Sequence, residues 1–196
     1  MMKVIGLTGG ISSGKSTVSR LLAKRGAVII DADKVGHEAF KPDTKPWREA
    51  VAAFGQQILT PGGEIDRDKL GKTVFESPRS LSLLNQIMHP LMYEMVKVQL
   101  EDYRRQGVGV VVLEAPLLVE AGWTSLVDEV WVAVAPETAV LKRLEERSGL
   151  YESKALARIR SQLSSEERVK HADVVVDTDC SLQELEVKVE KLWQGL

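Results

Sequence analysis

Short apolar runs alternate along this chain with longer stretches in which apolar residues recur every three or four positions. The short runs are rich in β-branched residues and are predicted as strands, whereas the longer stretches have the period of amphipathic helices. Strands are expected at residues 4–8, 27–31, 109–113, 129–133 and 173–177. Strands that alternate with helices favour a parallel sheet. The sequence therefore predicts an α/β fold, with a five-stranded parallel sheet and helices on both of its faces.

The stretch between the second and third predicted strands is much longer than one crossover helix requires. A turn is expected at residues 60–64 and a helix start at Ser77–Pro78. Apolar residues then keep helical spacing over residues 81–88 and 91–103, and His89–Pro90 is expected to break the helix between them. This stretch is therefore predicted to form a helical insertion.

The chain is expected to form a single domain, because no internal repeat, low-complexity tract or linker divides it. Its core is predicted to comprise residues 1–40, 107–140 and 172–196. The helical insertion covers residues 41–106, and a second, charged helical region covers residues 141–171. These helical pieces are interpreted as additions to one core.

Composition and charge narrow the class of protein. The chain has 196 residues and a formal net charge of −2, which gives no electrostatic reason to expect nucleic acid as a partner. The single cysteine, Cys180, excludes an intrachain disulfide and fits a reducing compartment. No apolar run approaches the roughly 18 residues of a membrane span, and residues 1–7 do not resemble a signal peptide. We expect a cytoplasmic protein with neither nucleic acid nor a membrane as a partner.

Residues 9–17 (GGISSGKST) fit the phosphate-binding pattern Gly-x-x-x-x-Gly-Lys-Ser without a mismatch. They stand between a predicted strand and a predicted helix, which is the context that such a loop requires. Successive backbone N–H groups are expected to point at phosphate oxygens, aided by the positive end of the helix dipole. Side chains at Gly9 and Gly14 would block the turn or the phosphate. A nucleoside triphosphate is the expected ligand.

The whole loop is predicted to contact the nucleotide. Lys15 is expected to supply a positive charge for the β- and γ-phosphates, and the Ser16 hydroxyl is the expected ligand of Mg²⁺. The predicted nucleotide-binding residues are Gly9, Gly10, Ile11, Ser12, Ser13, Gly14, Lys15, Ser16 and Thr17.

Other classes of nucleotide-binding protein fit this sequence poorly. A dinucleotide-binding fingerprint needs a glycine where Ile11 stands. A GTP-binding switch usually carries Asn-Lys-x-Asp, but Asn85, the only asparagine, is followed by Gln86. The nearest match to the transport-ATPase signature Leu-Ser-Gly-Gly-Gln begins at Leu163 and lacks both glycines. A small phosphotransferase remains, which needs an acceptor site, a base for the acceptor hydroxyl and cations for the moving phosphoryl group.

Acidic residues near the ends of two predicted strands are candidates for catalysis and metal binding. Asp33 follows the second strand, at the sheet edge from which the glycine loop projects, and is predicted to accept the proton of an incoming alcohol. The alternative is that Asp33 caps the following helix and Asp31 merely ends the strand. Glu114 closes the third strand and resembles the acidic residue that helps hold the water shell of magnesium. Its alternative role is that of a charged strand end.

Arg143 and Arg147 lie four residues apart, so on a helix they share a face. Guanidinium groups on a closing lid neutralise the charge that phosphoryl transfer spreads over three oxygens. Glu145 and Glu146 lie between them, which is equally typical of an ordinary solvated helix. Because the glycine loop is in the same chain, Arg147 and Arg143 are predicted to act on the nucleotide, with Ser148–Gly149 as a hinge.

Further motifs follow the glycine loop in a fixed order. They are IDAD at residues 30–33, Asp66–Arg67 with Val74–Phe75 after it, LNQIMHP at 84–90, PLLVE at 116–120, KRLEERSG at 142–149, ARIRSQ at 157–162 and ADVVVDT at 172–178. With LTGGISSGKST at residues 7–17, this series resembles the dephospho-coenzyme A kinase family over nearly the whole chain. Two positions depart mildly from the family: the turn at 178–180, which often contains asparagine, and Glu114, where members vary.

The resemblance implies ATP-dependent phosphorylation of the ribose 3′-hydroxyl of dephospho-coenzyme A, the last step of coenzyme A synthesis. It implies a P-loop NTPase fold similar to that of nucleoside monophosphate kinases, in which residues 41–106 bind substrate and residues 141–171 form a lid. It also implies that Asp33 lies beside the acceptor hydroxyl. The family positions expected to bind substrate are Asp33, Arg67, Asn85 and His89.

Two other functions remain open from the residues alone. One is another small-molecule kinase, such as a nucleoside or nucleoside monophosphate kinase, which shares the core but accepts a different alcohol or phosphate. The other is a non-catalytic nucleotide sensor, against which Lys15, Ser16 and Asp33 argue because a sensor needs no acceptor base. A monomer or a small homo-oligomer is expected.

Overall fold

The computed structural model describes residues 2–75, 77–148, 156, 159–160 and 162–196. The chain divides into two compact units. One unit combines Met1–Asp31 with Asp102–Leu196 and contains the sheet, and the other is the helical stretch Ala32–Glu101. The boundary after the second strand therefore lies at Asp31, so the segment up to residue 40 belongs with the helical unit and not with the predicted core.

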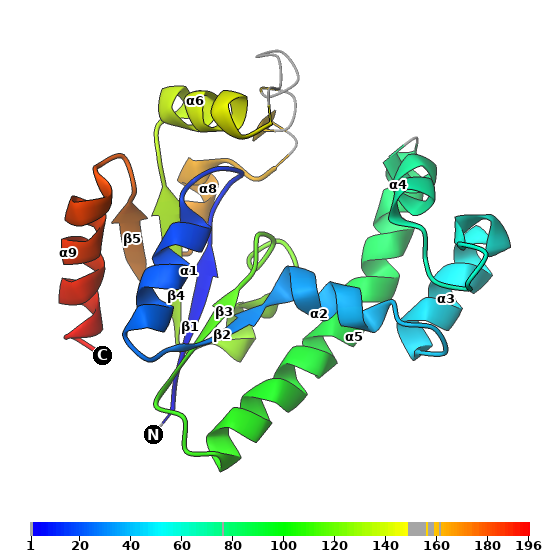
Figure 1. Ribbon diagram of the computed structural model, residues 1–196, viewed down its shortest axis with the longest axis horizontal. Helices are drawn as coiled ribbons and strands as arrows, with labels where there is room; N and C mark the ends of the chain where they lie inside the picture. The colour runs from blue at the N-terminus through cyan, green and yellow to red at the C-terminus, as the bar shows by residue number, and fades with distance from the viewer. Residues whose placement is uncertain (1, 76, 149–155, 157–158, 161) are drawn as a thin grey trace. The chain divides into compact units, whose positions relative to one another are not determined.

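All five predicted strands are present and lie in one parallel sheet (Figure 1). Each agrees with its predicted range to within one residue at either end, and the strand order is β2-β3-β1-β4-β5. The strands are β1 (Lys3–Thr8), β2 (Val28–Asp31), β3 (Val110–Glu114), β4 (Glu129–Val134) and β5 (Val174–Asp177). Because β1 lies in the middle, the loop that follows it emerges between β3 and β4.

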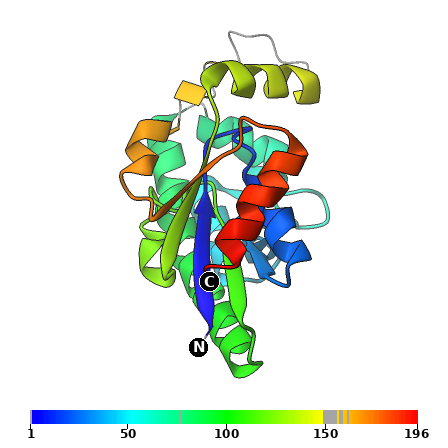
Figure 2. The same ribbon diagram turned by 90° about the vertical axis from the view of Figure 1, so that its left-hand side faces the viewer.

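Helices cover both faces of this sheet, as predicted. Figure 2 shows α1 (Lys15–Lys24) and α9 (Leu182–Trp193) on one face and α8 (Ser165–Val169) on the other. The short 3₁₀ turn η2 (Trp123–Leu126) precedes β4, and the helix α6 (Glu137–Ser148) follows β4. The face under α1 and α9 is closed by an apolar cluster that includes Ile5, Leu7, Leu22, Trp131 and Val189, each at most 1% exposed. This packing holds α1 and α9 against the sheet.

The helical unit has a core of its own. It consists of α2 (Ala32–Ala39), α3 (Lys45–Phe54), the 3₁₀ turn η1 (Gln56–Ile58), α4 (Arg67–Phe75) and α5 (Pro78–Arg105) as far as Glu101. Ala50, Phe54, Ile58, Leu70 and Val74 are buried together. The turn predicted at residues 60–64 is confirmed by a bond from Thr60 N–H to the Glu64 carbonyl at 2.8 Å. The helix start predicted at Ser77–Pro78 is confirmed by the first residue of α5.

The predicted helix break at His89–Pro90 is wrong. The helix α5 runs without interruption from Pro78 to Arg105, with Pro90 inside it. Proline removes only its own N–H from the ladder and crowds one carbonyl of the preceding turn. Met88 and Val96 are buried on either side of Pro90, and their packing stabilises the continuous helix. Although α5 has 28 residues, neither it nor any other helix in the described part of the chain is long and apolar enough to cross a membrane.

The charged helical region predicted at residues 141–171 contains most of α6 and all of α8. Residues 149–155, 157–158 and 161, with the expected hinge at Gly149, lie outside the described residues. The described part thus places one helix of the predicted lid directly after β4 and the other directly before β5.

Candidate functional site

The loop between β1 and α1 adopts a strongly curved backbone. Ser12 and Gly14 have positive φ angles of 54° and 86°, a geometry in which successive N–H groups form a concave anion-binding nest. A Cβ atom on Gly9 would lie 2.5 Å from the Ser13 hydroxyl oxygen and 2.6 Å from the Ala133 carbonyl oxygen. A Cβ atom on Gly14 would lie 2.8 Å from Thr178 Oγ1. The expectation that side chains at these two glycines would block the turn is therefore confirmed.

Three predicted site residues meet at the mouth of this loop. Lys15 and Ser16 begin α1, and Glu114 ends the adjacent strand β3. Lys15 Nζ lies 2.7 Å from Glu114 Oε1, and the Ser16 hydroxyl donates to the same oxygen at 2.8 Å. The side chains of Lys15 and Glu114 are only 13% and 12% exposed, so the ion pair is largely shielded from water. The parallel register that aligns Leu7 with Glu114 brings these residues together.

The ionisation of Glu114 is set by two opposed effects. Burial raises the pKa of the Glu114 carboxyl, but the Lys15 ammonium and the Ser19 and Ser16 hydroxyls stabilise the carboxylate more strongly. The net pKa of Glu114 lies below its ordinary value. Glu114 is therefore a carboxylate at neutral pH, paired with Lys15 and Ser16.

The same cluster has the donor chemistry that Mg²⁺ prefers. Magnesium binds oxygen ligands and is usually held by one or two protein groups together with substrate phosphates and water. Ser16 Oγ and Glu114 Oε1 are two such oxygens, 2.8 Å apart. Across the described residues, no group of three or more His, Cys, Asp or Glu side chains is arranged to hold a metal by itself. The site thus fits a Mg²⁺ ion that shares its coordination with a polyphosphate.

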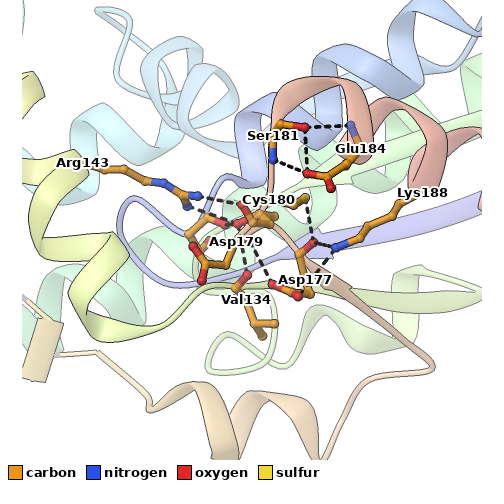
Figure 3. A network of polar contacts seen from close by, with 10 residues as sticks. Val134, Arg143, Asp177, Asp179, Cys180, Ser181, Glu184 and Lys188 are labelled. Atoms are coloured by element: carbon orange, nitrogen blue, oxygen red, sulfur yellow. Dashed lines mark hydrogen bonds and ion pairs between the residues drawn. The ribbon is translucent and has the colours of Figure 1, made fainter.

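Arg143 was expected to contact the nucleotide, and its guanidinium contacts the protein in this structure. It reaches from α6 to the turn between β5 and α9, which carries Asp179 and Cys180 (Figure 3). Its Nη1 donates to the Ser12 carbonyl and to Thr178 Oγ1, both at 3.2 Å, and its Nη2 donates to the Thr178 carbonyl at 2.7 Å. Its contact with the nucleotide stays a prediction.

One further contact with the loop, and one buried ion pair near it, come from residues to which the sequence gave no role. The side-chain oxygen of Gln162 accepts the N–H of Ile11 at 2.9 Å. The buried Arg168 donates to Glu120 at 2.8 Å, and its Nη1 would lie 3.5 Å from a Cβ atom on Gly10. Gln162 belongs to a quoted family motif, but its separation of 151 residues from Ile11 left no local signal of contact.

In the helical unit, Asp33 lies in the first turn of α2 and is not the residue before the helix. The Asp33 carbonyl accepts a bond of 2.6 Å from His37 Nδ1, and the Arg67 guanidinium contacts His37 Nε2. Because a guanidinium only donates, Nε2 accepts and the ring proton resides on Nδ1. His37, which was not predicted to be a site residue, thereby connects Arg67 to the backbone of Asp33.

Asn85 and His89 lie one helical turn apart on α5. Burial lowers the pKa of the His89 ring below its usual value, so the neutral ring predominates at pH 7. The roles of both residues in substrate binding stay predictions. The side chain of Arg147, near the end of α6, lies outside the described residues.

The sheet order, the glycine loop after β1 and the Lys15–Ser16–Glu114 cluster define a P-loop kinase. The sequence model of the dephospho-CoA kinase family matches residues 3–184. A dephospho-CoA kinase from Dehalococcoides mccartyi is 44% identical over 97% of this chain and 96% of its own. The chain belongs to the dephospho-CoA kinase family, as the series of motifs indicates, and is an enzyme of the kinase class.

Solved structures agree with this assignment. A protein from Thermus thermophilus superposes with a TM-score of 0.82 at 33% identity, covering 100% of this chain and 98% of the other. A dephospho-CoA kinase from Campylobacter jejuni superposes with a TM-score of 0.75 at 27% identity, covering 99% and 96%. The P-loop kinase fold predicted from the sequence is confirmed.

Proposed function

We propose that this chain transfers the γ-phosphoryl group of ATP to the 3′-hydroxyl of the ribose of dephospho-coenzyme A, with Mg²⁺ as the metal. The observation that carries the proposal is the cluster of Lys15, Ser16 and Glu114 beside the curved loop. It supplies an ammonium for phosphate oxygens and two oxygens for a divalent cation at one sheet edge. Ser16 and Glu114 would hold Mg²⁺, which would neutralise phosphate charge.

The loop is proposed to bind the triphosphate through its backbone N–H groups. The first N–H groups of α1 have no acceptor within the helix, and they lie at the positive end of its dipole. The contacting residues are those of the predicted set from Gly9 to Thr17. Lys15 then exchanges one anionic partner, Glu114, for another, the β- and γ-phosphates, so its charge stays paired throughout.

Asp33 is proposed to be the base for the acceptor. The 3′-oxygen attacks the γ-phosphorus, the bond from that phosphorus to the β,γ-bridging oxygen breaks, and ADP leaves. The hydroxyl proton passes to the Asp33 carboxylate and then to water. Lys15 and Arg147 are proposed to neutralise the charge that develops on the transferring group, with Arg143 contributing from the same helix.

The acceptor is proposed to bind to the helical unit through Asp33, Arg67, Asn85 and His89. The contact of Arg67 with His37 supports this assignment, because it orients a guanidinium from the start of α4 in the unit that carries Asp33. A fixed guanidinium suits the phosphate groups of an acceptor such as dephospho-coenzyme A. Residues 141–171 are proposed to be the lid.

The proposal also covers partners and compartment. ATP and dephospho-coenzyme A are proposed as small-molecule partners, with no role for nucleic acid or a membrane, in a cytoplasmic monomer or small homo-oligomer. The net charge of −2 and the lone cysteine support this part of the proposal.

The proposed reaction is tested by incubating the purified chain with ATP, Mg²⁺ and one acceptor at a time. The acceptors are dephospho-coenzyme A, a nucleoside and a nucleoside monophosphate, and the readout is ADP released. We expect rapid release of ADP only when the acceptor is dephospho-coenzyme A. Turnover of the monophosphate without turnover of dephospho-coenzyme A rejects the proposal.

The role of Asp33 has its own test. Asp33→Asn is expected to bind ATP normally but to lose phosphoryl transfer by about 100-fold or more, since positioned general bases contribute on that order. Asp43→Asn is the matched control, because Asp43 is exposed and in the same helical unit. A near-normal kcat in Asp33→Asn removes Asp33 from the chemistry.

A further inference from the structure

We propose that Thr178, with Arg143 behind it, is a positioning residue that aims the backbone N–H of Gly14 at the nucleotide phosphates. This inference rests on the proposed function only in that the glycine loop binds a polyphosphate. Thr178 follows β5 and is distant from the loop in sequence, and its side chain is 2% exposed. It contacts no substrate in this proposal and acts through the loop alone.

The Thr178 hydroxyl lies directly against the loop. Its oxygen is 2.7 Å from the Ser13 carbonyl oxygen and 3.1 Å from the Val134 carbonyl oxygen, so the single hydroxyl proton is best donated to Ser13. The same oxygen accepts Nη1 of Arg143 at 3.2 Å. Cβ and Cγ2 of Thr178 lie 2.9 and 3.0 Å from where a Cβ atom on Gly14 would be. Thr178 therefore fixes the peptide between Ser13 and Gly14 by a hydrogen bond and by close packing.

The planarity of the peptide bond turns this contact into a constraint on phosphate binding. In a trans peptide the carbonyl of one residue and the N–H of the next point in opposite directions. A hydroxyl that holds the Ser13 carbonyl on one side of the loop thus directs the Gly14 N–H to the other side. That N–H belongs to the nest formed around Ser12 and Gly14.

Arg143 holds the preceding residue in the same manner. It donates to the Ser12 carbonyl, and Ser12 has a φ of 54°, a conformation that non-glycine residues adopt only against a steric cost. The second guanidinium nitrogen of Arg143 donates a hydrogen bond to the Thr178 carbonyl at 2.7 Å. Arg143 thus bonds to the loop at Ser12 and to the turn at Thr178. These bonds hold the loop in its curved conformation before the phosphates bind.

The turn that carries Thr178 is itself rigid. Lys188 donates to the Asp177 carbonyl at 3.0 Å, and the Asp179 N–H donates to the Asp177 carboxylate at 2.9 Å (Figure 3). Ser181 and Glu184 cap α9 reciprocally, directly after the turn. The Thr178 hydroxyl is therefore held in a fixed position relative to the loop.

The test compares Thr178→Val, Thr178→Ser and Ser181→Ala. Valine keeps the branched shape of threonine and removes the hydroxyl, serine keeps the hydroxyl, and Ser181→Ala weakens the same turn without a contact to the loop. The Kd of ADP with Mg²⁺ is measured by calorimetry, and the KM values of ATP and dephospho-coenzyme A by steady-state kinetics. We expect Thr178→Val to weaken ADP binding about tenfold, since it leaves the Ser13 carbonyl unpaired. The KM of ATP should rise, whereas the KM of dephospho-coenzyme A should stay unchanged.

The controls separate positioning from general loss of structure. Thr178→Ser is expected to restore the Kd of ADP to within about threefold, because it returns the hydrogen bond. Ser181→Ala is expected to lower the melting temperature while leaving the Kd of ADP unchanged, since it removes only a helix cap. A native Kd of ADP in Thr178→Val, or an equal rise in Thr178→Val and Ser181→Ala, overturns the proposal.

Arg143→Met supplies a second route should Thr178→Val fail to fold. It is expected to weaken ADP binding as well, because it removes the hydrogen bonds that hold the Ser12 carbonyl and Thr178. Normal ADP binding by Arg143→Met overturns the proposal. Normal ADP binding by the native chain without formation of coenzyme A contradicts the proposed function and leaves this inference intact.

Discussion

Lys15 is the residue on which phosphate binding chiefly depends. Its ammonium lies 2.7 Å from Glu114 and is mostly shielded from water. A flexible four-carbon stem lets it turn from this carboxylate to a phosphate while the rest of α1 stays fixed. Within a shielded site, one positive charge on a transferring phosphoryl group has a large effect on rate.

Removing that charge is therefore expected to abolish most turnover. Lys15→Met should lower kcat/KM for ATP by about 100-fold to 1,000-fold, the range typical of losing one electrostatic contact in a transition state. The matched control is Lys24→Met, at the exposed end of the same helix. Steady-state kinetics check the prediction, and turnover within threefold of native in Lys15→Met contradicts it.

The lowered pKa of Glu114 gives a prediction about stability and pH. A carboxyl whose pKa is lower in the folded chain contributes stability that is fully present above the unfolded-state value of about 4.3 and is lost as the pH falls through the folded-state pKa. The unfolding free energies of the native chain and of Glu114→Gln should therefore differ by a constant amount from about pH 7 to about pH 5. Below about pH 4 the difference should shrink. Denaturant titrations at each pH provide the measurement, and a difference that stays constant down to pH 3 contradicts the account.

At the scale of elements, α5 shows how tertiary packing overrides a local signal. A proline in a helix interior is unfavourable by about 3 kcal/mol relative to alanine, yet α5 continues through Pro90. The sequence shows that Pro90 interrupts a helical spacing of apolar residues. It does not show that Met88 and Val96 are buried, which favours the continuous helix. The strands, by contrast, were predicted to within one residue because their apolar runs are short and bounded by turns.

Replacing Pro90 should therefore stabilise the chain. Pro90→Ala restores an N–H to the helix ladder, and we expect a gain of about 1 to 2 kcal/mol after the greater freedom of the unfolded chain is subtracted. Pro78→Ala is the matched control, because Pro78 is the first residue of α5, a position at which an N–H has no partner within the helix. Thermal unfolding of both variants provides the comparison. A lower melting temperature for Pro90→Ala than for Pro78→Ala contradicts this account of α5.

At the scale of the whole molecule, the nucleotide site depends on contacts between distant parts of the chain. Lys15, Ser16 and Glu114 were foreseen because each ends or begins an element at the same sheet edge. Gln162 and Thr178 were not foreseen, since hydrogen bonds across 151 and 165 residues leave no periodicity in the sequence. Such contacts follow from the strand order, which brings the end of β5 toward the loop after β1 by way of β4.

A site assembled in this way exists only in the folded chain, so its ligand should stabilise the fold. ADP with Mg²⁺ at a hundred times its Kd is expected to add about 2.7 kcal/mol and to raise the melting temperature by about 5 to 10 °C. Lys15→Met should show a much smaller rise under the same conditions. Differential scanning calorimetry tests this, and equal shifts in both proteins contradict the assignment of the site.

The most direct test of the account is mass spectrometric identification of the product that the purified chain makes from ATP, Mg²⁺ and dephospho-coenzyme A. The account predicts coenzyme A and ADP in equal amounts, with the new phosphate on the ribose 3′-oxygen. Failure of a folded, ADP-binding chain to form coenzyme A, or a phosphate found at another position, contradicts it.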